Sequence, residues 1–318
     1  MHVLLIGLGN FGMSWFQDIL CKTEEIEMIL VCERDEKRMN MGKEIAKAQE
    51  KPCCFFYNLS RALIAPVDFI INVSPPHLHK ETTLMCLRNG APVLLEKPIA
   101  LNKEDAQIIY QASRERGVPL VIAENYRFMS FMRLAKEKIA SGLIGNLQSI
   151  DVYFARMHHM ENYHRDLAEP LLMDVAIHHL DAMRYLTGEE CELQFGETYN
   201  PSWSHYQGNA NVNLFIKTRK GVRISYCGTL ASRFPNQYSS WLADWTIQGD
   251  KGYIQIRGDE MTYQLLCGDV VKLDGGTDFD GRKALLNEFM TSIDEKRAAE
   301  TDIADNLKTF NLAATVLE

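Results

Sequence analysis

Continuously apolar runs alternate with polar stretches over the first 122 residues of the chain. These runs have the length of β-strands and lie at 3–6, 28–32, 55–57, 67–73, 92–95 and 119–122. Strands that are apolar at every position are typical of a parallel sheet covered by helices on both faces. The pattern therefore predicts an α/β fold for this half of the chain, with a doubly wound parallel sheet.

In the rest of the chain, apolar residues recur with a different period. Apolar and polar residues alternate in short segments, which predicts strands with one buried face at 147–155, 212–217, 222–229, 244–248, 253–256 and 261–267. Helical patterns cover 131–141, 171–186, 283–297 and 303–317. We therefore predict a first domain of residues 1–122 and a second, α+β domain of residues 123–318 with an open, mostly antiparallel sheet.

A glycine-rich turn, Gly7-Leu8-Gly9-Asn10-Phe11-Gly12, lies between the first apolar run and the first helical stretch. This order of strand, turn and helix is the context of a dinucleotide-binding turn. Gly7 permits a sharp turn, Gly9 lets the backbone approach a pyrophosphate, and Gly12 lets the helix pack on the strand. Backbone N–H groups at Asn10 and Phe11 would then face the phosphates. The alternative is an ordinary turn at the start of a strand–helix–strand unit.

The second apolar run ends at Glu33, about 20 residues after the turn, where a carboxylate can accept the ribose hydroxyls of NAD. A carboxylate repels the 2′-phosphate of NADP, whereas Arg34 beside it could attract that phosphate. The pair therefore predicts NAD as the cofactor, with NADP as the alternative.

Two further loops follow strand ends and should meet the glycine-rich turn at one edge of the sheet, because the carboxyl ends of parallel strands lie together. The first contains Ser74, Pro75 and His79, and the second contains Glu96 and Lys97. We predict that all five contact the cofactor. A lysine at this edge could also bind an alkoxide oxygen or be a solvated charge, and the following proline favours a functional role because it fixes the local backbone.

The helix predicted for 171–186 is apolar on most of its surface. Asp174, His178, Asp181 and Tyr185 share one side of it at 3.6 residues per turn. A polar stripe on a helix that is otherwise buried must face something polar, so a site is a better interpretation than a solvent face. His179 lies on the apolar stripe and is predicted to be structural. An Asp–His pair could also hold a metal, but no further ligand has suitable spacing, so no metal is predicted.

The remaining candidate histidines, His158, His159, His164 and His205, have no such spacing. They could line a substrate pocket or lie in a loop.

Composition narrows the classes of function. The chain has 318 residues, a net charge of −8 and no block of like charges, so neither nucleic acid nor a membrane surface is expected as a partner. No signal peptide and no membrane-spanning run is evident. The eight cysteines form no CxxC pair and several lie in predicted strands or helices, which predicts reduced thiols in a cytoplasmic protein.

Taken together, the glycine-rich turn, Glu96-Lys97-Pro98 and Asp174-Val175-Ala176-Ile177-His178-His179-Leu180-Asp181 resemble the glucose–fructose oxidoreductase / inositol dehydrogenase (Gfo/Idh/MocA) family. The segment Glu124-Asn125-Tyr126-Arg127-Phe128 is similar to the family's linker between domains. The chain departs from the family pattern at Ala168-Glu169-Pro170, where members usually have three glycines, and at Ala176.

The resemblance implies an N-terminal Rossmann domain, a C-terminal domain whose open sheet forms homodimers or homotetramers, and NAD or NADP as cofactor. It also implies a site between the domains in which Lys97, Asp174 and His178 meet a sugar, with further substrate contacts from Tyr126 and Arg127.

The mechanism that we expect is oxidation of a secondary alcohol of a sugar, inositol or related polyol. Histidine side chains ordinarily ionise near neutral pH, so His178 is the predicted base, Lys97 the cationic donor to the substrate oxygen and Asp174 the residue that orients His178. Two alternatives remain: an NAD-dependent glycoside hydrolase of the same fold, and a non-catalytic sensor that binds the dinucleotide.

Overall fold

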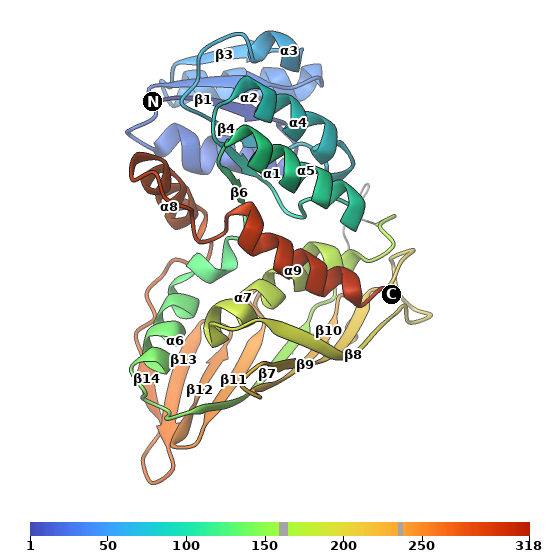
Figure 1. Ribbon diagram of the computed structural model, residues 1–318, viewed down its shortest axis with the longest axis vertical. Coiled ribbons are helices and arrows are strands. Elements are labelled where there is room, and N and C mark those ends of the chain that lie inside the picture. Colours follow the sequence, from blue (N-terminus) through green and yellow to red (C-terminus); the bar gives the residue numbers. More distant parts are fainter. Residues whose placement is uncertain (159–164, 235–237) are drawn as a thin grey trace. The chain divides into compact units, whose positions relative to one another are not determined.

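A computed structural model describes residues 1–158, 165–234 and 238–318, so His159 and His164 lie outside the described residues. The chain forms two compact units (Figure 1). Unit 1 contains Met1–Glu124 and Arg282–Leu307, and unit 2 contains Asn125–Gly281 and Lys308–Glu318. The sequence prediction assigned everything after residue 122 to one domain, but the chain returns to unit 1 near its end.

Unit 1 is built on a six-stranded sheet with the order β3-β2-β1-β4-β5-β6, in which every neighbouring pair is parallel. The strands are β1 (His2–Ile6), β2 (Met28–Cys32), β3 (Cys53–Phe56), β4 (Phe69–Asn72), β5 (Val93–Leu95) and β6 (Leu120–Ile122). Strands β1, β4 and β5 are almost entirely buried, as continuously apolar runs require. The predicted doubly wound parallel sheet is confirmed.

The helices of unit 1 begin and end largely where the sequence places the caps. They are α1 (Asn10–Ser14), η1 (Trp15–Ile19), η2 (Leu20–Lys22), α2 (Glu36–Ala48), α3 (Leu59–Ala62), η3 (Pro76–Leu78), α4 (His79–Asn89), α5 (Lys103–Arg116), α8 (Arg282–Asp294) and the first part of α9 (Ile303–Thr315). The side chain of Asn102 accepts a hydrogen bond from Asp105 N at the start of α5, and Gly117 ends that helix with a positive φ.

Helix α8 and the segment that precedes α9 join unit 1 through contacts that connect distant parts of the chain. The rings of Phe69 on β4 and Phe289 on α8 pack edge to face at 5.3 Å. Thr301 Oγ1 donates a hydrogen bond of 2.8 Å to the carbonyl oxygen of Ile122 at the end of β6. Local sequence patterns do not show such pairings, so the prediction missed this return.

Unit 2 contains an eight-stranded sheet with the order β14-β13-β12-β11-β7-β10-β9-β8. Its strands are β7 (Leu147–Ala155), β8 (Cys191–Tyr199), β9 (Asn211–Thr218), β10 (Arg223–Thr229), β11 (Asp244–Gly249), β12 (Gly252–Arg257), β13 (Glu260–Leu265) and β14 (Val271–Leu273). All neighbouring pairs are antiparallel except β7 with β10, which confirms the predicted mostly antiparallel sheet. The outer strands β8 and β14 were not predicted, because edge strands carry many polar residues.

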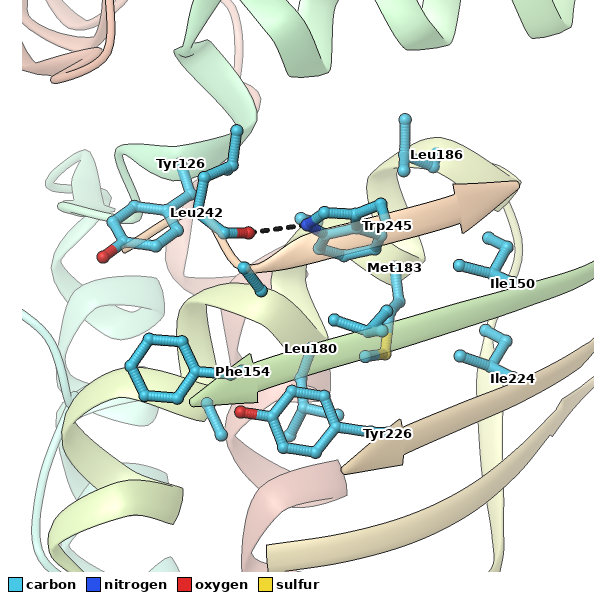
Figure 2. Close-up of a cluster of buried hydrophobic side chains, with 14 of the residues drawn as sticks. Tyr126, Ile150, Phe154, Leu180, Met183, Leu186, Ile224, Tyr226, Leu242 and Trp245 are labelled. Carbon is cyan, nitrogen blue, oxygen red and sulfur yellow. Dashed lines mark hydrogen bonds between the residues drawn. The ribbon is translucent and has the colours of Figure 1, made fainter. Parts of the chain in front are cut away.

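One face of this sheet packs against helices. These are η4 (Tyr126–Phe128), α6 (Ser130–Ala140), η6 (Leu172–Ala176), α7 (Ile177–Thr187) and the part of α9 that belongs to unit 2. Figure 2 shows part of the core, in which Leu180 and Met183 of α7 meet Ile150, Ile224 and Trp245 of the sheet. On the other face, alternate residues point away from this core, and large side chains such as Tyr153 and Phe215 are exposed there.

All eight cysteines are free thiols, of which Cys21, Cys32 and Cys86 are buried. Cys54, Cys227 and Cys267 are exposed, and Cys53 and Cys191 are half-buried. Among the described residues, no helix is both long and apolar enough to cross a membrane.

Candidate active site

The glycine-rich turn has the geometry that the sequence predicts. Gly7 has a φ of +94°, and a Cβ there would lie 2.7 Å from the carbonyl oxygen of Val73. A Cβ at Gly12 would collide with the carbonyl oxygen of Gly7, so helix α1 packs against the turn only because Gly12 has no side chain. At Gly9 a Cβ would meet only the guanidinium of Arg38, at 3.4 Å, which leaves room above this backbone for a ligand.

The start of α1 also suits a phosphate group. Gly9 is the N-cap residue, and no side chain of the described residues caps the helix. Asn10 and Phe11 are exposed, and their N–H groups lie in the first turn of the helix. The turn therefore fits the pyrophosphate of a dinucleotide.

Glu33 lies directly beside this turn. Its carboxylate accepts hydrogen bonds from the backbone N–H groups of Leu8 (2.6 Å), Arg34 (2.6 Å) and Asp35 (2.9 Å). The side chain of Arg34 is exposed, as a contact with a 2′-phosphate would need. Sequence reasoning missed Arg38, whose Nη1 donates to the carbonyl oxygen of Leu8 at 2.9 Å.

The loop after β4 is held by buried polar groups. Asn72, which is fully buried, donates to the hydroxyl groups of Thr82 and Thr83 and accepts a hydrogen bond from Ser74 N. The hydroxyl of Ser74 is itself buried against Thr82 at 3.1 Å, whereas Pro75 is exposed. Sequence reasoning missed Asn72, although a polar residue at the end of an apolar strand is a usable signal.

His79 connects the two loops at the sheet edge. Its Nε2 lies 2.7 Å from the carbonyl oxygen of Ser74, and its Nδ1 lies 2.8 Å from that of Pro98. The ring is fully buried, and this burial lowers the pKa of His79 to about 4, although the backbone carbonyl groups oppose the change. His79 therefore positions the two loops, and its predicted contact with the cofactor stays a prediction.

Glu96 and Lys97 lie at the end of β5. The carboxylate of Glu96 is buried and accepts hydrogen bonds from Trp15 Nε1 (2.6 Å) and from the backbone N–H of Lys97 (3.2 Å). The Lys97–Pro98 peptide bond is cis. Glu96 thus ties the lysine-bearing loop to helix η1, while the side chain of Lys97 is half-buried.

Arg282, the first residue of α8, packs against the residues that follow the glycine-rich turn in unit 1. Its guanidinium lies 4.8 Å from the ring of Phe11 and 5.5 Å from that of Trp15, and Nη2 donates to Ser14 Oγ at 3.1 Å. Neither Arg282 nor Trp15 was a sequence candidate, because their significance depends on contacts between distant parts of the chain.

In unit 2 the predicted helix 171–186 is not regular. Residues Leu172–Ala176, which include Asp174, form a turn of π-helix before α7 begins at Ile177. Such wider turns occur often at functional sites. Because the prediction assumed 3.6 residues per turn throughout, its projection of Asp174 onto the face of later residues does not hold across this turn. Asp174 is half-buried.

His178 and His179 have different surroundings. The ring of His178 stacks on that of Tyr126 with centroids 4.2 Å apart and planes 10° apart. His179 Nε2 donates to the carbonyl oxygen of Trp241 at 2.9 Å, and its Nδ1 forms a hydrogen bond of 3.1 Å with the Tyr226 hydroxyl. His179 is thus a hydrogen-bonded core residue, as the sequence predicted.

Two members of the predicted polar stripe have structural partners. Asp181 forms a bidentate ion pair with Arg127 (2.6 and 2.7 Å), and both side chains are almost fully buried. Tyr185 accepts a hydrogen bond from Arg133 Nη1 at 2.9 Å. The stripe is therefore not a single site-facing surface. Arg127 fixes α7 through Asp181, and its predicted contact with the substrate stays a prediction.

A cavity of about 330 Å³ lies at the end of the sheet in unit 2. Its lining includes Trp203, whose indole N–H donates to the carbonyl oxygen of Ala231, and Tyr206, whose hydroxyl donates to that of His158. His205 also lines this cavity. Within the described part of the chain, no group of three His, Cys, Asp or Glu side chains could hold a metal ion.

The parallel sheet with its glycine-rich turn defines unit 1 as an NAD-binding Rossmann domain of an oxidoreductase. Residues 1–124 match a profile described as "Oxidoreductase family, NAD-binding Rossmann fold", and residues 132–255 match the GFO/IDH/MocA C-terminal domain. The chain belongs to the GFO/IDH/MocA family of oxidoreductases, which confirms the resemblance seen in the sequence.

Relatives of several activities resemble this chain. It is 28% identical to 4-carboxy-2-hydroxymuconate-6-semialdehyde dehydrogenase from Sphingobium sp. over 98% of this chain and 96% of that protein. It is 24% identical to myo-inositol 2-dehydrogenase from Thermotoga maritima, over 62% of this chain and 58% of that protein. A crystal structure of an oxidoreductase from Agrobacterium radiobacter in complex with NAD+, L-tartaric acid and magnesium shares the fold, with a TM-score of 0.88, 19% identity, and coverage of 98% of this chain and 94% of that one.

Proposed function

We propose that the protein is an NAD(P)-dependent dehydrogenase that transfers a hydride between the nicotinamide and a secondary alcohol of a sugar, inositol or related polyol. The observation that carries this proposal is the ordered edge of the unit 1 sheet. There the glycine-rich turn, Glu33 and the anchored Glu96-Lys97 pair all follow strand ends, where ligands of parallel sheets bind. The family membership and the relative named myo-inositol 2-dehydrogenase support the choice of substrate class.

In this proposal, the cofactor contacts Gly7, Gly9 and Gly12 of the turn, the exposed Asn10 and Phe11, and the later strand ends. Bound nicotinamide supplies the hydride acceptor. Glu33 accepts the ribose hydroxyls, for which it exchanges one of its present backbone partners, and this favours NAD over NADP. Measuring the dissociation constants of NAD+ and NADP+ tests the preference, and tighter binding of NADP+ would reverse it.

Proton transfer is assigned to side chains of both units. His178 takes the hydroxyl proton during oxidation, because imidazole is the ordinary base near neutral pH. Lys97 donates a charge-assisted hydrogen bond to the same substrate oxygen and stabilises the developing alkoxide. Asp174 orients His178 and a substrate hydroxyl.

The test is a screen of NAD+ and NADP+ reduction over sugars and inositols, and of NADH and NADPH oxidation over their oxidised forms. With a substrate found, His178→Asn should lower kcat by about 10²–10⁴-fold and leave the dissociation constant of NAD+ nearly unchanged. His77→Asn, at an exposed histidine of unit 1, is the matched control and should behave like the native protein. An unchanged kcat in His178→Asn would refute the assignment.

The same screen separates the alternatives. A glycoside hydrolase of this fold would release nitrophenol from nitrophenyl glycosides without net NADH formation. A non-catalytic sensor would bind the dinucleotide and turn over nothing.

We also propose that the protein is a homodimer or homotetramer that assembles through the open face of the unit 2 sheet. Tyr153 on β7 and Phe215 on β9 are 45% and 39% exposed on that face. Large exposed side chains on a regular surface favour a protein interface. Tyr153→Asp should lower the mass measured by analytical ultracentrifugation, and a monomeric native protein would contradict the proposal.

A further inference from the structure

The ring of Tyr126 stacks on that of His178, the candidate base. The two rings are nearly parallel and 4.2 Å apart, and their residues are only 9% and 5% exposed. At this distance the π face of a tyrosine packs on a ring of either charge and, in addition, attracts a cation electrostatically. The attraction is stronger where water is excluded, as it is here.

Tyr126 cannot easily move away from this position, because both of its neighbours in the chain are anchored. Asn125 Nδ2 donates to the carbonyl oxygen of Asp280 at 2.6 Å. Arg127 holds Asp181, one turn after His178 on α7, through two hydrogen bonds. The short helix η4 therefore fixes the tyrosine ring and the histidine helix relative to one another within unit 2.

We propose that the Tyr126 ring stabilises the protonated imidazole of His178 and holds it in one orientation, so that Tyr126 is a positioning residue for proton transfer. This inference rests on the proposed function for its catalytic meaning. During oxidation His178 changes from a neutral ring to an imidazolium, and the π face favours the second form. The proton leaves the substrate hydroxyl and stays on the imidazole until it is released to solvent.

Other charged and titratable side chains of unit 2 lie on the elements packed against α7. They include Asp174 on η6, His179, Asp181, Arg184 and Tyr185 on α7, Arg127 on η4, Arg133, Lys136, Glu137 and Lys138 on α6, and Tyr226 on β10. Asp181 and Arg127 compensate each other in their ion pair, and His179 is held by Tyr226 and a carbonyl group. A change confined to the Tyr126 ring leaves all of these charges in place.

The experiment replaces the ring in steps. Tyr126→Phe keeps the π face and removes the hydroxyl, whereas Tyr126→Leu removes the π face. Incorporation of difluoro- and tetrafluorophenylalanine at position 126 keeps the ring shape and progressively weakens the attraction for a cation, which guards against a leucine variant that fails to fold.

The first readout needs no substrate. In NMR spectra of protein with labelled histidine, assigned with His178→Asn, the His178 Cε1–H resonance should show the upfield ring-current shift of a stacked ring. The shift should persist in Tyr126→Phe and disappear in Tyr126→Leu. In the fluorinated series the resonance should titrate at progressively lower pH, over a range of about 0.5 to 1 pH unit. A position and titration that do not respond to these changes would overturn the proposal.

The second readout uses the substrate. In Tyr126→Leu and the fluorinated series, the acid limb of the kcat profile should move to lower pH by the same amount, while the plateau falls about 3- to 10-fold and KM stays unchanged. A lower plateau without movement of the acid limb would mean a merely structural role and would overturn the proposal. Should no substrate be turned over, the proposed function fails, but the NMR titration still decides whether the stack acts on His178.

Discussion

Acid should destabilise unit 1 through His79. The pKa of this buried ring is lowered from 6.5 to about 4, so between these values the unfolded chain binds the proton and the folded chain does not. The stability of the folded state therefore falls as the pH drops from 6.5 towards 4. Each unit of difference is worth about 1.4 kcal/mol, which gives a loss of about 3 kcal/mol from this residue.

The comparison with His79→Gln isolates this loss. Glutamine does not titrate, and its amide can still donate to one of the two carbonyl groups, of Ser74 or Pro98, that the ring now faces. The variant should be less stable than the native protein at pH 7, and the difference should shrink by about 3 kcal/mol at pH 4.

The assay is urea unfolding at each pH, with pulsed hydrogen exchange of peptides from β4 and β5 to report on unit 1 alone. Titration of the carboxylates changes the free energy of unfolding of both proteins equally, so this contribution cancels in the comparison. In the opposite result, the stability of the native protein relative to the variant would rise as the pH falls. This would mean that an imidazolium donates to both carbonyl groups. That outcome would refute the reasoning from burial.

Three further predictions concern other parts of the structure. Gly9→Ala should keep the native melting temperature but weaken NAD+ binding at least about 10-fold in calorimetry, whereas Gly12→Ala, whose Cβ would overlap a backbone oxygen, should lower the melting temperature itself. Burial raises the pKa of Glu169, so ionisation of this carboxyl group destabilises the folded protein as the pH rises above the ordinary pKa of glutamate. The melting temperature of Glu169→Gln relative to the native protein should therefore increase from pH 4 to pH 7, and a constant difference would contradict this. Arg127→Met should cost about 3–5 kcal/mol in urea unfolding because it removes the guanidinium that balances the buried charge of Asp181, and a loss below about 1 kcal/mol would argue against the ion pair.

Local physics explains what the sequence predicts well. The turn at Gly7 and Gly12 depends on backbone geometry that only glycine permits, so its residues can be recognised without a structure. Strand β7 was predicted with its observed bounds, because Ile150, Val152 and Phe154 alternate with polar or exposed neighbours. Asn102 and Gly117 mark the ends of α5 by the same kind of local chemistry.

Long-range pairings explain the features that the sequence does not predict. The partner of Asp181 is Arg127, more than fifty residues away, so a helix projection can show that Asp181 needs a polar neighbour but not which one. The anchoring of Glu96 by Trp15 and the covering of Phe11 by Arg282 likewise depend on tertiary packing. The π-helical turn at Asp174 also escaped prediction, because no residue pattern in this stretch marks a local widening of the helix.

The most direct test of the central claim is a crystal structure of the protein with NAD+ and a polyol that it oxidises. The account predicts that Lys97 Nζ and a ring nitrogen of His178 both lie within hydrogen-bond reach, about 2.6–3.2 Å, of one substrate oxygen. The carbon that bears this oxygen should lie about 3–3.5 Å from the reactive carbon of the nicotinamide. A bound polyol whose reacting hydroxyl contacts neither side chain would contradict the assignment of both residues.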